Sequence, residues 1–401
     1  MNPSRPGHTS VRASSPLAAF AGGIANFSIS RTGAILASAA LAVVVTDYAS
    51  AANRIWNGSA SALWSNNGNW NGNGVSNGDT LNFSGTTTLT NTNDALTSIG
   101  SITFTAGAGQ FTLNGNTATL TGSVINSATT TQTLGLGLNM SATQTFDAAA
   151  GSLVMNGALG QTAASGLTKT GSFALSLNNN TNTYTGTTTV SAGTLFANGS
   201  TAATGSGAIS VASGATFGGS GTIAPTGSNG INVSGVLAPG ASVGTVGTLT
   251  FNMSGTTGTA TLASGASLAF DLGLAGTSIT SVGSSDLLVL AGASSGDFTF
   301  NGNSINFQGT GSNGFYKLFD TSSNNANTWT GLTFNGTTGV VSGGLSITNL
   351  ASGKTGTLIV GTASNGGTTG DIYLQVVPES SSLLLAALGS GLLLRRRRIP
   401  S

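Results

Sequence analysis

The chain has 401 residues, and only 5% of them are charged, which leaves a formal net charge of +1 at pH 7. Residues 52–376 contain four basic and eight acidic residues and so carry a net charge of −4, which gives no reason to expect a nucleic-acid partner. The chain has no cysteine, which excludes a scaffold held by disulfides, so an exported form has to rely on burial and backbone hydrogen bonds.

An export signal is expected over residues 1–51. Its basic residues are arginines, residues 34–45 form an apolar run, and the small residues Ala49 and Ala51 offer a site for signal peptidase. The part ahead of the apolar run is long for a signal peptide, and a buried helix of a folded domain is the alternative. His8, the only histidine, lies in the segment expected to be removed, so neither a ligand nor a catalytic role is expected for it.

Residues 52–104 are expected to form an N-terminal cap and the first turns of the repeat region that follows. Trp56, Trp64 and Trp70 are three of the four tryptophans of the chain and lie among many asparagines. Large amphipathic rings suit the closure of an exposed core at the end of a repeat stack. The alternative is an aromatic platform on which these three rings contact a carbohydrate.

Short β-strands are predicted in many places, because apolar residues recur at every second position between glycines, asparagines and serines. Leu134, Leu136, Leu138 and Met140 form one such run. This alternation argues against disorder, which arises from a shortage of apolar surface. An all-β fold is therefore expected.

The predicted strands recur with a period of about 21 residues in the region 105–255. Similar segments begin at Gly151, Gly171, Gly193, Gly214 and Gly235. A short repeat of strand and turn predicts the coils of a parallel β-helix, in which neighbouring coils bury each other's inward side chains. About fifteen coils spaced by about 4.8 Å would make a rod of roughly 70 Å. A β-sandwich with less regular strand spacing is the alternative.

The same alignment predicts which side chains face inward. Phe173 is aligned with Leu153 and is therefore expected in an inward column of the stack. The substitution Phe173→Asp would then leave an unpaired carboxylate in a dry core, at a cost of several kcal/mol.

A resemblance to a known repeat family rests on three stretches of this region. Residues 166–171 (GLTKTG) and 182–195 (NTYTGTTTVSAGTL) are similar to the autotransporter-associated β-strand repeat, and residues 237–246 (LAPGASVGTV) look like a companion motif. The close likeness covers residues 105–255. It implies a right-handed β-helical passenger domain on a bacterial surface. The membrane barrel that ends a true autotransporter is not expected, because a different signal stands in its place.

Residues 256–376 are expected to form either the distal part of the stack or a small separate β-domain. Apolar strands are predicted around residues 286–290, 315–319 and 371–376. Lys317, in the second of these strands, is expected on a solvated face.

An enzyme of the polysaccharide lyase or hydrolase type has to be considered, since such enzymes also use β-helices. Their sites need clustered carboxylates or bound calcium. Asp271 and Asp286 are out of phase with one coil, whereas Asp297 and Asp320, twenty-three residues apart, could lie on adjacent coils. We expect no catalytic residue, no metal ligand and no cofactor, and Asp297 with Asp320 is the pair that would be tested first.

The C-terminal segment has the pattern of a membrane address. Val377, Pro378 and Glu379 precede three serines, an apolar run covers residues 383–394, and a basic cluster follows. The cluster consists of Arg395, Arg396, Arg397 and Arg398. An apolar run closed by basic residues predicts a stop-transfer segment. Twelve helical residues span about 18 Å, less than the roughly 30 Å of a bilayer core, which suits a transient anchor better than an ordinary tail anchor.

In this order the three parts resemble the PEP-CTERM sorting signal of Gram-negative bacteria, in which a Pro-Glu-Pro-like motif, a short transmembrane segment and an arginine cluster follow one another. Ser380 stands where that family usually has its second proline. The resemblance covers residues 377–398 and implies processing by an exosortase-like membrane protease or transpeptidase.

The expected protein is a structural or adhesive one, exported to the cell surface or extracellular matrix of a Gram-negative bacterium. Its expected partners are signal peptidase, an exosortase-like enzyme and an envelope or matrix polysaccharide, and its hold on the inner membrane would be transient. The alternative is a carbohydrate-binding or polysaccharide-lyase-like β-helix protein.

Overall fold

The computed structural model describes residues 51–379 except 72, 243, 293–296, 310 and 322–327. These residues all belong to one compact unit of the chain. The predicted export signal up to residue 50, including Ala49, lies outside the described residues. So do the predicted apolar run and the arginine cluster Arg395 to Arg398.

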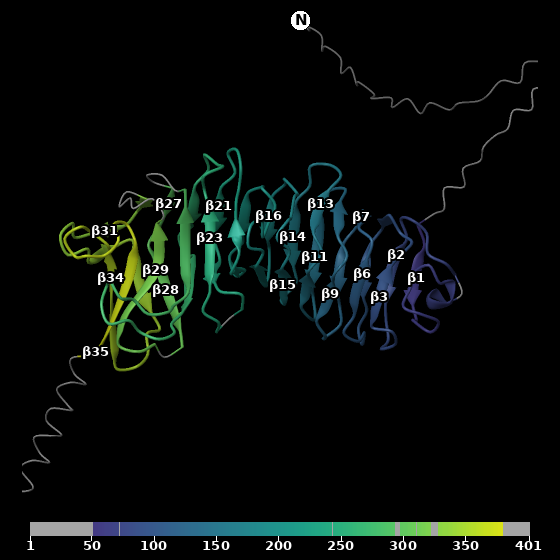
Figure 1. Cartoon of the computed structure of the whole chain (residues 1–401), viewed down its shortest axis with the longest axis horizontal. Helices are drawn as coiled ribbons and strands as arrows, with labels where there is room; N and C mark the ends of the chain where they lie inside the picture. The colour runs from purple at the N-terminus through teal and green to yellow at the C-terminus, as the bar shows by residue number, and fades with distance from the viewer. Residues whose placement is uncertain are drawn as a thin grey trace, which may run out of the picture. The chain divides into compact units, whose positions relative to one another are not determined.

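The described chain winds into a stack of coils in which each strand pairs with a strand of the next coil (Figure 1). These pairings are parallel until the C-terminal end of the stack is reached. The expected all-β fold is confirmed, with long parallel sheets in the arrangement of a solenoid.

The first sheet has twelve strands. They are β1 (Asn53–Trp56), β2 (Thr80–Phe83), β5 (Ile102–Phe104), β8 (Val124–Asn126), β11 (Gln144–Ala148), β14 (Leu167–Thr170), β16 (Thr188–Val190), β18 (Ile209–Val211), β21 (Ile231–Val233), β24 (Ala260–Leu262), β27 (Phe298–Thr299) and β30 (Trp329–Thr330).

The second sheet has eleven strands. They are β3 (Thr90–Asn93), β6 (Thr112–Gly115), β9 (Gln132–Leu134), β12 (Leu153–Met155), β15 (Ala174–Leu177), β17 (Thr194–Ala197), β19 (Thr216–Gly219), β22 (Val236–Pro239), β25 (Ser267–Asp271), β28 (Asn303–Gln308) and β33 (Leu345–Thr348).

The third side of the coils is built from two shorter sheets. The four-stranded sheet contains β4 (Ser98–Ile99), β7 (Ala118–Leu120), β10 (Leu138–Met140) and β13 (Leu159–Gln161). The six-stranded sheet contains β20 (Thr222–Ile223), β23 (Thr248–Asn252), β26 (Leu287–Ala291), β29 (Gly314–Thr321), β35 (Ile372–Pro378) and β34 (Lys354–Val360). A short 3-10 turn, η1 (Asn67–Trp70), and the hairpin β31 (Thr333–Phe334) and β32 (Val341–Gly343) complete the described elements.

The coils lengthen toward the C-terminal end. On the second sheet the paired residues Leu175 and Leu195 are 20 residues apart, whereas Leu268 and Ile305 are 37 apart and Ile305 and Ile347 are 42 apart. The expectation of about fifteen coils was therefore too high, because the 21-residue period does not extend into the distal region. Twelve strands at about 4.8 Å extend roughly 50 Å.

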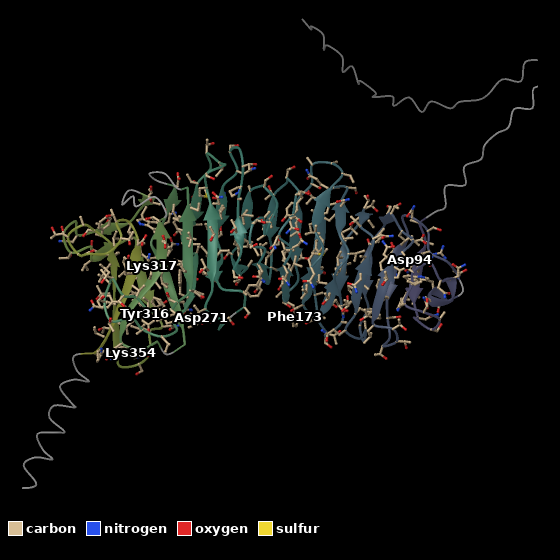
Figure 2. The ribbon with its side chains drawn as sticks, viewed as in Figure 1. Asp94, Phe173, Asp271, Tyr316, Lys317 and Lys354 are labelled. Carbon is tan, nitrogen blue, oxygen red and sulfur yellow. The ribbon has the colours of Figure 1, made fainter. Side chains whose placement is uncertain are left out.

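The register on the second sheet corrects the position predicted for Phe173. Leu153 pairs with Leu175, and Leu175 pairs with Leu195, so Leu175 occupies the inward column. Phe173 lies in the turn ahead of β15 and is 45% exposed (Figure 2). The glycine-based alignment was wrong here, because this coil places two more residues between its glycine and its strand.

Clusters of aromatic side chains lie at the two ends of the core, and its middle combines aliphatic side chains with single rings such as Phe146 and Phe217. At the N-terminal end Trp56, Trp64 and Trp70 pack around Phe83. At the C-terminal end the rings of Phe298, Phe300, Phe319 and Trp329 pack together. Large rings thus close the stack where no further coil can cover it.

The distal region continues the stack and then ends it with antiparallel strands. β24, β27 and β30 extend the first sheet, and β25, β28 and β33 extend the second. On the third side β35 inserts antiparallel between β29 and β34. The open question between a continued stack and a separate domain is thereby answered in favour of the stack.

Candidate functional site

Lys169, from the repeat motif GLTKTG, lies in the inward column of the first sheet. It pairs with Phe146 on one side and Val190 on the other, and it is fully buried. Its Nζ donates to the carbonyl oxygens of Thr170 at 2.5 Å, Gly171 at 2.9 Å and Ala192 at 3.2 Å. Burial lowers the pKa of Lys169 to about 8, against a smaller opposing effect of Asp147. This lysine holds the turn between coils and presents nothing to solvent.

Asn182 and Tyr184, from the second repeat motif, also serve the stack. Asn182 bridges neighbouring coils, because its Oδ1 accepts the N–H of Leu159 at 2.8 Å and its Nδ2 donates to the carbonyl of Ala203 at 2.9 Å. Tyr184 is fully buried, and its hydroxyl lies 2.7 Å from Oγ1 of Thr188. Burial raises the pKa of Tyr184. The residues that make the motif recognisable are used inside the fold.

The three N-terminal tryptophans form the predicted cap and not an exposed platform. Trp56 and Trp64 are 0% exposed and Trp70 is 1% exposed. Trp64 donates from Nε1 to Oδ1 of Asn91 at 2.7 Å, and Trp70 donates from Nε1 to the carbonyl of Trp64 at 2.8 Å. The interpretation that these rings contact a carbohydrate is corrected, because stacking on a sugar needs an open ring face.

Two carboxylates whose spacing is out of phase with one coil, Asp271 and Asp286, are brought together beside the second sheet. Asp271 ends β25, and a bridge between Leu272 and Ser285 returns the chain to Asp286. Oδ2 of Asp286 accepts the N–H of Asp271 at 2.8 Å. The 21-residue period does not predict this pair. The fifteen residues from Asp271 to Asp286 leave the stack and return to it, so their spacing does not follow the repeat.

These two carboxylates hold the loop that contains the LAPGASVGTV motif. Oδ2 of Asp271 accepts the N–H of Gly244 at 2.9 Å, and Oδ1 of Asp286 accepts the N–H of Gly247 at 2.8 Å. Burial raises the pKa of Asp286 to about 7; its two backbone hydrogen bonds oppose this shift, and the charge of Asp271 adds to it.

The cavity beside the carboxylates is too small for a sugar. It has a volume of about 10 Å³ and is lined on its apolar side by Phe196, Ala238 and Ala269. That volume suits about one water molecule. The carboxylate pair therefore serves as a latch for the loop.

Asp297 and Asp320, the pair of aspartates that the sequence favoured, lie on different sheets. Asp297 stands just before β27 of the first sheet, and Asp320 lies in β29 on the third side, where it pairs with Val289 of the adjacent coil. The charged neighbour of Asp320 is Lys317, at 3.2 Å. Asp297 and Asp320, which by their spacing could have shared a site on adjacent coils, are therefore not brought together in phase.

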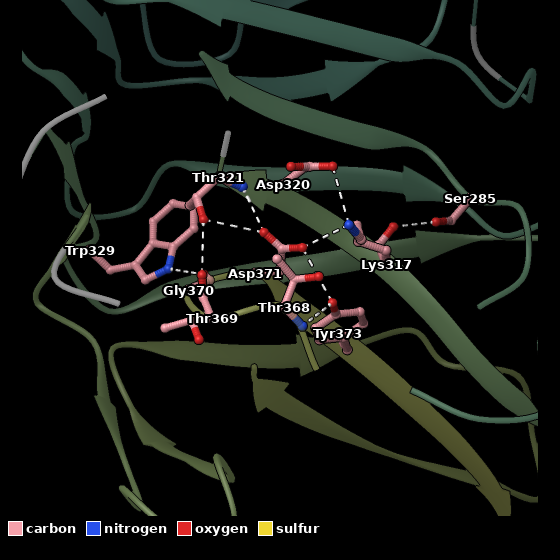
Figure 3. A network of polar contacts seen from close by, with 10 residues as sticks. All are labelled: Ser285, Lys317, Asp320, Thr321, Trp329, Thr368, Thr369, Gly370, Asp371 and Tyr373. Atoms are coloured by element: carbon pink, nitrogen blue, oxygen red, sulfur yellow. Dashed lines mark hydrogen bonds and ion pairs between the residues drawn. The ribbon is translucent and has the colours of Figure 1, made fainter. Parts of the chain in front are cut away.

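Lys317, expected on a solvated face, keeps 23% of its side chain exposed, but its ammonium group lies in an ionic network. Its Nζ lies 2.7 Å from Oδ2 of Asp371, which is fully buried (Figure 3). Its Nζ also lies 5.8 Å from the centre of the Tyr373 ring. Burial alone would lower the pKa of Lys317, but the hydrogen bonds and charges of Asp371 and Asp320 outweigh burial and raise it. The sequence held no signal for this network, because Lys317 and Asp371 are joined only by the antiparallel return of β35.

An uncharged polar row runs along the outer face of the first sheet. One side chain from each of eight successive coils contributes to it, and every neighbouring pair is in register. The row consists of Thr145, Thr168, Thr189, Ser210, Asn232, Thr261, Thr299 and Thr330. None of these residues is buried. Hydroxyl and amide groups thus repeat at the strand spacing of about 4.8 Å.

The described part of the predicted sorting motif is continuous with the fold. Val377 and Pro378 end β35 and pair with Thr355 and Lys354 of β34. The N–H of Glu379 donates to the carbonyl of Gly353 at 2.9 Å. The boundary expected between residues 376 and 377 therefore falls inside the last strand.

The N-terminal end of the described fold is held by Asp79. Its Oδ1 accepts the N–H of Ala52 at 2.8 Å, and its Oδ2 lies 2.7 Å from Nε of Arg54. Burial would raise the pKa of Asp79, but Arg54 and the backbone N–H groups of Ala52 and Ser76 outweigh burial and lower it. Asp79 thus fixes Ala52, the residue that follows the expected signal-peptidase site at Ala51.

Among residues 51–379, with the gaps named above, no cluster of three or more His, Asp or Glu side chains could hold a metal ion. The same part of the chain has no helix long and apolar enough to cross a membrane. In comparisons with known proteins, no family model and no curated protein matches this chain.

Proposed function

We propose that the chain is an exported structural or adhesive protein of the bacterial cell surface or extracellular matrix, built as a right-handed β-helix. The observation that carries the proposal is the uncharged row on the first sheet, from Thr145 to Thr330. Each of eight coils places one uncharged hydroxyl or amide side chain on the outer face, while Lys169, Asn182 and Tyr184 of the repeat motifs are used inside the stack. An extended, neutral partner with its own short repeat suits such a face.

Export and sorting form the second part of the proposal. Signal peptidase removes residues 1–51, and an exosortase-like enzyme acts at Val377, Pro378 and Glu379 after a transient hold on the inner membrane. Two contacts support it. Asp79 accepts a hydrogen bond from Ala52, so a new ammonium group there would face a carboxylate. Glu379 leaves the stack beside Gly353, at the end of the described chain.

A carbohydrate-binding protein remains the second candidate function. The same polar row favours it, because hydroxyl and amide groups at strand spacing can bond successive units of an extended polysaccharide. The buried tryptophans and the small cavity at Asp286 do not contribute to this function. The resemblance to a polysaccharide lyase has no residue in its favour within the described chain.

Retention at the surface of the native host tests the adhesive role. The double substitution Thr168→Ala and Thr189→Ala removes two adjacent hydroxyls of the row. The matched control, Thr194→Ala and Thr216→Ala, removes two adjacent hydroxyls from the second sheet. The proposal expects weaker retention for the first pair only. Equal retention for wild type and both pairs would contradict the role given to the row. A screen of the purified protein against neutral polysaccharides would then decide whether the row binds a glycan.

A further inference from the structure

The ammonium group of Lys317 stands between two carboxylates at the junction of β29 and β35. Its Nζ is 2.7 Å from Oδ2 of Asp371 and 3.2 Å from Oδ2 of Asp320 (Figure 3). Lys317 lies opposite Tyr373 in the antiparallel pairing, and Tyr373 follows Asp371 by two residues. The three charged groups therefore meet where the last strand of the third side joins the stack.

The two carboxylate oxygens of Asp371 have different surroundings. Oδ1 accepts the N–H of Thr321 at 2.8 Å and lies 3.2 Å from the hydroxyl of the same residue. Oδ2 faces Nζ of Lys317 and the hydroxyl of Tyr373, which is 3.3 Å away. Two donors fixed on one oxygen suit the negative charge that develops on a carbonyl oxygen under attack. Oδ2, the other oxygen, lies beside the two proton donors and can leave as water once it is protonated.

We propose that Lys317 and Asp371 form an intramolecular isopeptide bond between Nζ and Cγ, with Asp320 as the group that carries the proton. The geometry points to this reaction because the amine already contacts one oxygen of the buried Asp371 carboxylate and one oxygen of a second carboxylate. Proximity of this kind converts a slow bimolecular condensation into a unimolecular one.

The reaction consumes no reagent. One ammonium proton of Lys317 moves to Oδ2 of Asp371, which gives a neutral amine and a carboxylic acid. The nitrogen lone pair then attacks Cγ, and the negative charge moves to Oδ1. Asp320 takes a second proton from nitrogen and passes it to the Oδ2 hydroxyl. That hydroxyl leaves as water, the carbonyl reforms on Oδ1, and Asp320 is again a carboxylate.

The ion pair is the resting state before reaction, since the neighbouring carboxylates raise the pKa of Lys317. A buried ion pair by itself is weak evidence for stability, because desolvation of both charges offsets their attraction. A covalent bond removes both charges and ties β29 to β35. In a chain without cysteine, this bond would stabilise the C-terminal end by cross-linking it, as a disulfide does in other proteins. It would also pass tension from the sorting segment into the stack.

The mass of the folded full-length protein tests the proposal. The chain should be lighter by one water than its sequence, and tandem mass spectrometry of a digest should show one branched species that joins the peptides of Lys317 and Asp371. Lys169 is the internal control, because it is fully buried and its Nζ bonds only to backbone carbonyls. Its peptide should be unmodified. Folded wild-type protein in which both peptides remain separate after prolonged incubation would overturn the proposal.

Two variants separate the roles of the three residues. Lys317→Arg keeps the positive charge and should abolish the branched species. Asp320→Asn keeps the contact between Lys317 and Asp371, and we expect it to slow bond formation at least 100-fold, in line with loss of general acid–base assistance. A branched species that forms at the wild-type rate in Asp320→Asn would remove Asp320 from the mechanism. A branched species in Lys317→Arg would show that another amine reacts.

Discussion

Single polar side chains inside the stack set its response to pH. Lys169 sits in an otherwise apolar column and satisfies its ammonium group with three backbone carbonyls. Asp286 is held by backbone N–H groups beneath a glycine-rich loop. Burial favours the neutral form of both side chains, so it lowers the pKa of Lys169 and raises that of Asp286. Each residue therefore couples folding to the uptake or release of a proton.

Lys169 should make the protein more stable as pH rises from about 8 toward 10.5. Its pKa is about 8 in the folded chain, against 10.5 for an ordinary lysine, so the unfolded chain binds more protons in this window. Above the pKa of Lys169 in the unfolded chain, its burial does not lower the free energy of unfolding. That free energy falls as the pH is lowered toward and through the pKa of Lys169 in the folded chain. Lys169→Met should remove this part of the pH dependence in denaturant melts. An unchanged slope in Lys169→Met would contradict the buried position.

Asp286 should produce the opposite slope between about pH 4 and 7. Its folded pKa is raised to about 7 from 3.8, so the folded chain binds more protons in this window and stability falls as pH rises. Asp286→Asn should flatten the slope. Asp94→Asn is the control: its two hydrogen bonds from Ser65 outweigh burial and lower its pKa, so its contribution lies at lower pH. A wild-type slope in Asp286→Asn would argue against the buried carboxyl.

At the scale of elements, the alternation of apolar and polar residues predicted which segments form strands better than it predicted how those strands align with their neighbours. The apolar runs around residues 134–140 and 286–290 both form strands with inward apolar residues. Register failed at Phe173, where turn length varies between coils and a glycine is not a fixed marker. The distal strands were predicted, but the antiparallel pairing of β34 with β35 was not. The chain reverses direction between these two strands, and the 21-residue repeat gives no sign of this reversal.

The corrected register predicts the effect of charge on two neighbouring positions. Leu175→Asp puts a carboxylate into the inward column between Leu153 and Leu195 and should cost about 3–5 kcal/mol of unfolding free energy. Phe173→Asp changes an exposed turn and should stay within about 0.5 kcal/mol of wild type. Urea melts of the two variants check this, and equal losses would mean that the pairing of β15 is misassigned.

At the scale of the whole molecule, the parallel stack could be predicted from the sequence, but its groups of interacting side chains could not. The 21-residue period between Gly151 and Gly235 carries the coil geometry, because stacked coils need like residues at like positions. The latch at Asp271 and Asp286 and the network at Lys317 arise from excursions and returns of unequal length. Sequence spacing says little about which side chains such loops bring together.

In the proposed function the stack is the delivered form of the protein, and both terminal segments are removed. Intact-mass measurement of the protein recovered from the surface or matrix of its native host tests this most directly. We expect a chain that begins at Ala52 and lacks Arg395 to Arg398, lighter by one further water from the bond at Lys317. Surface material that still carries the arginine cluster would contradict the sorting proposal, and material that still begins ahead of Ala52 would contradict the export signal.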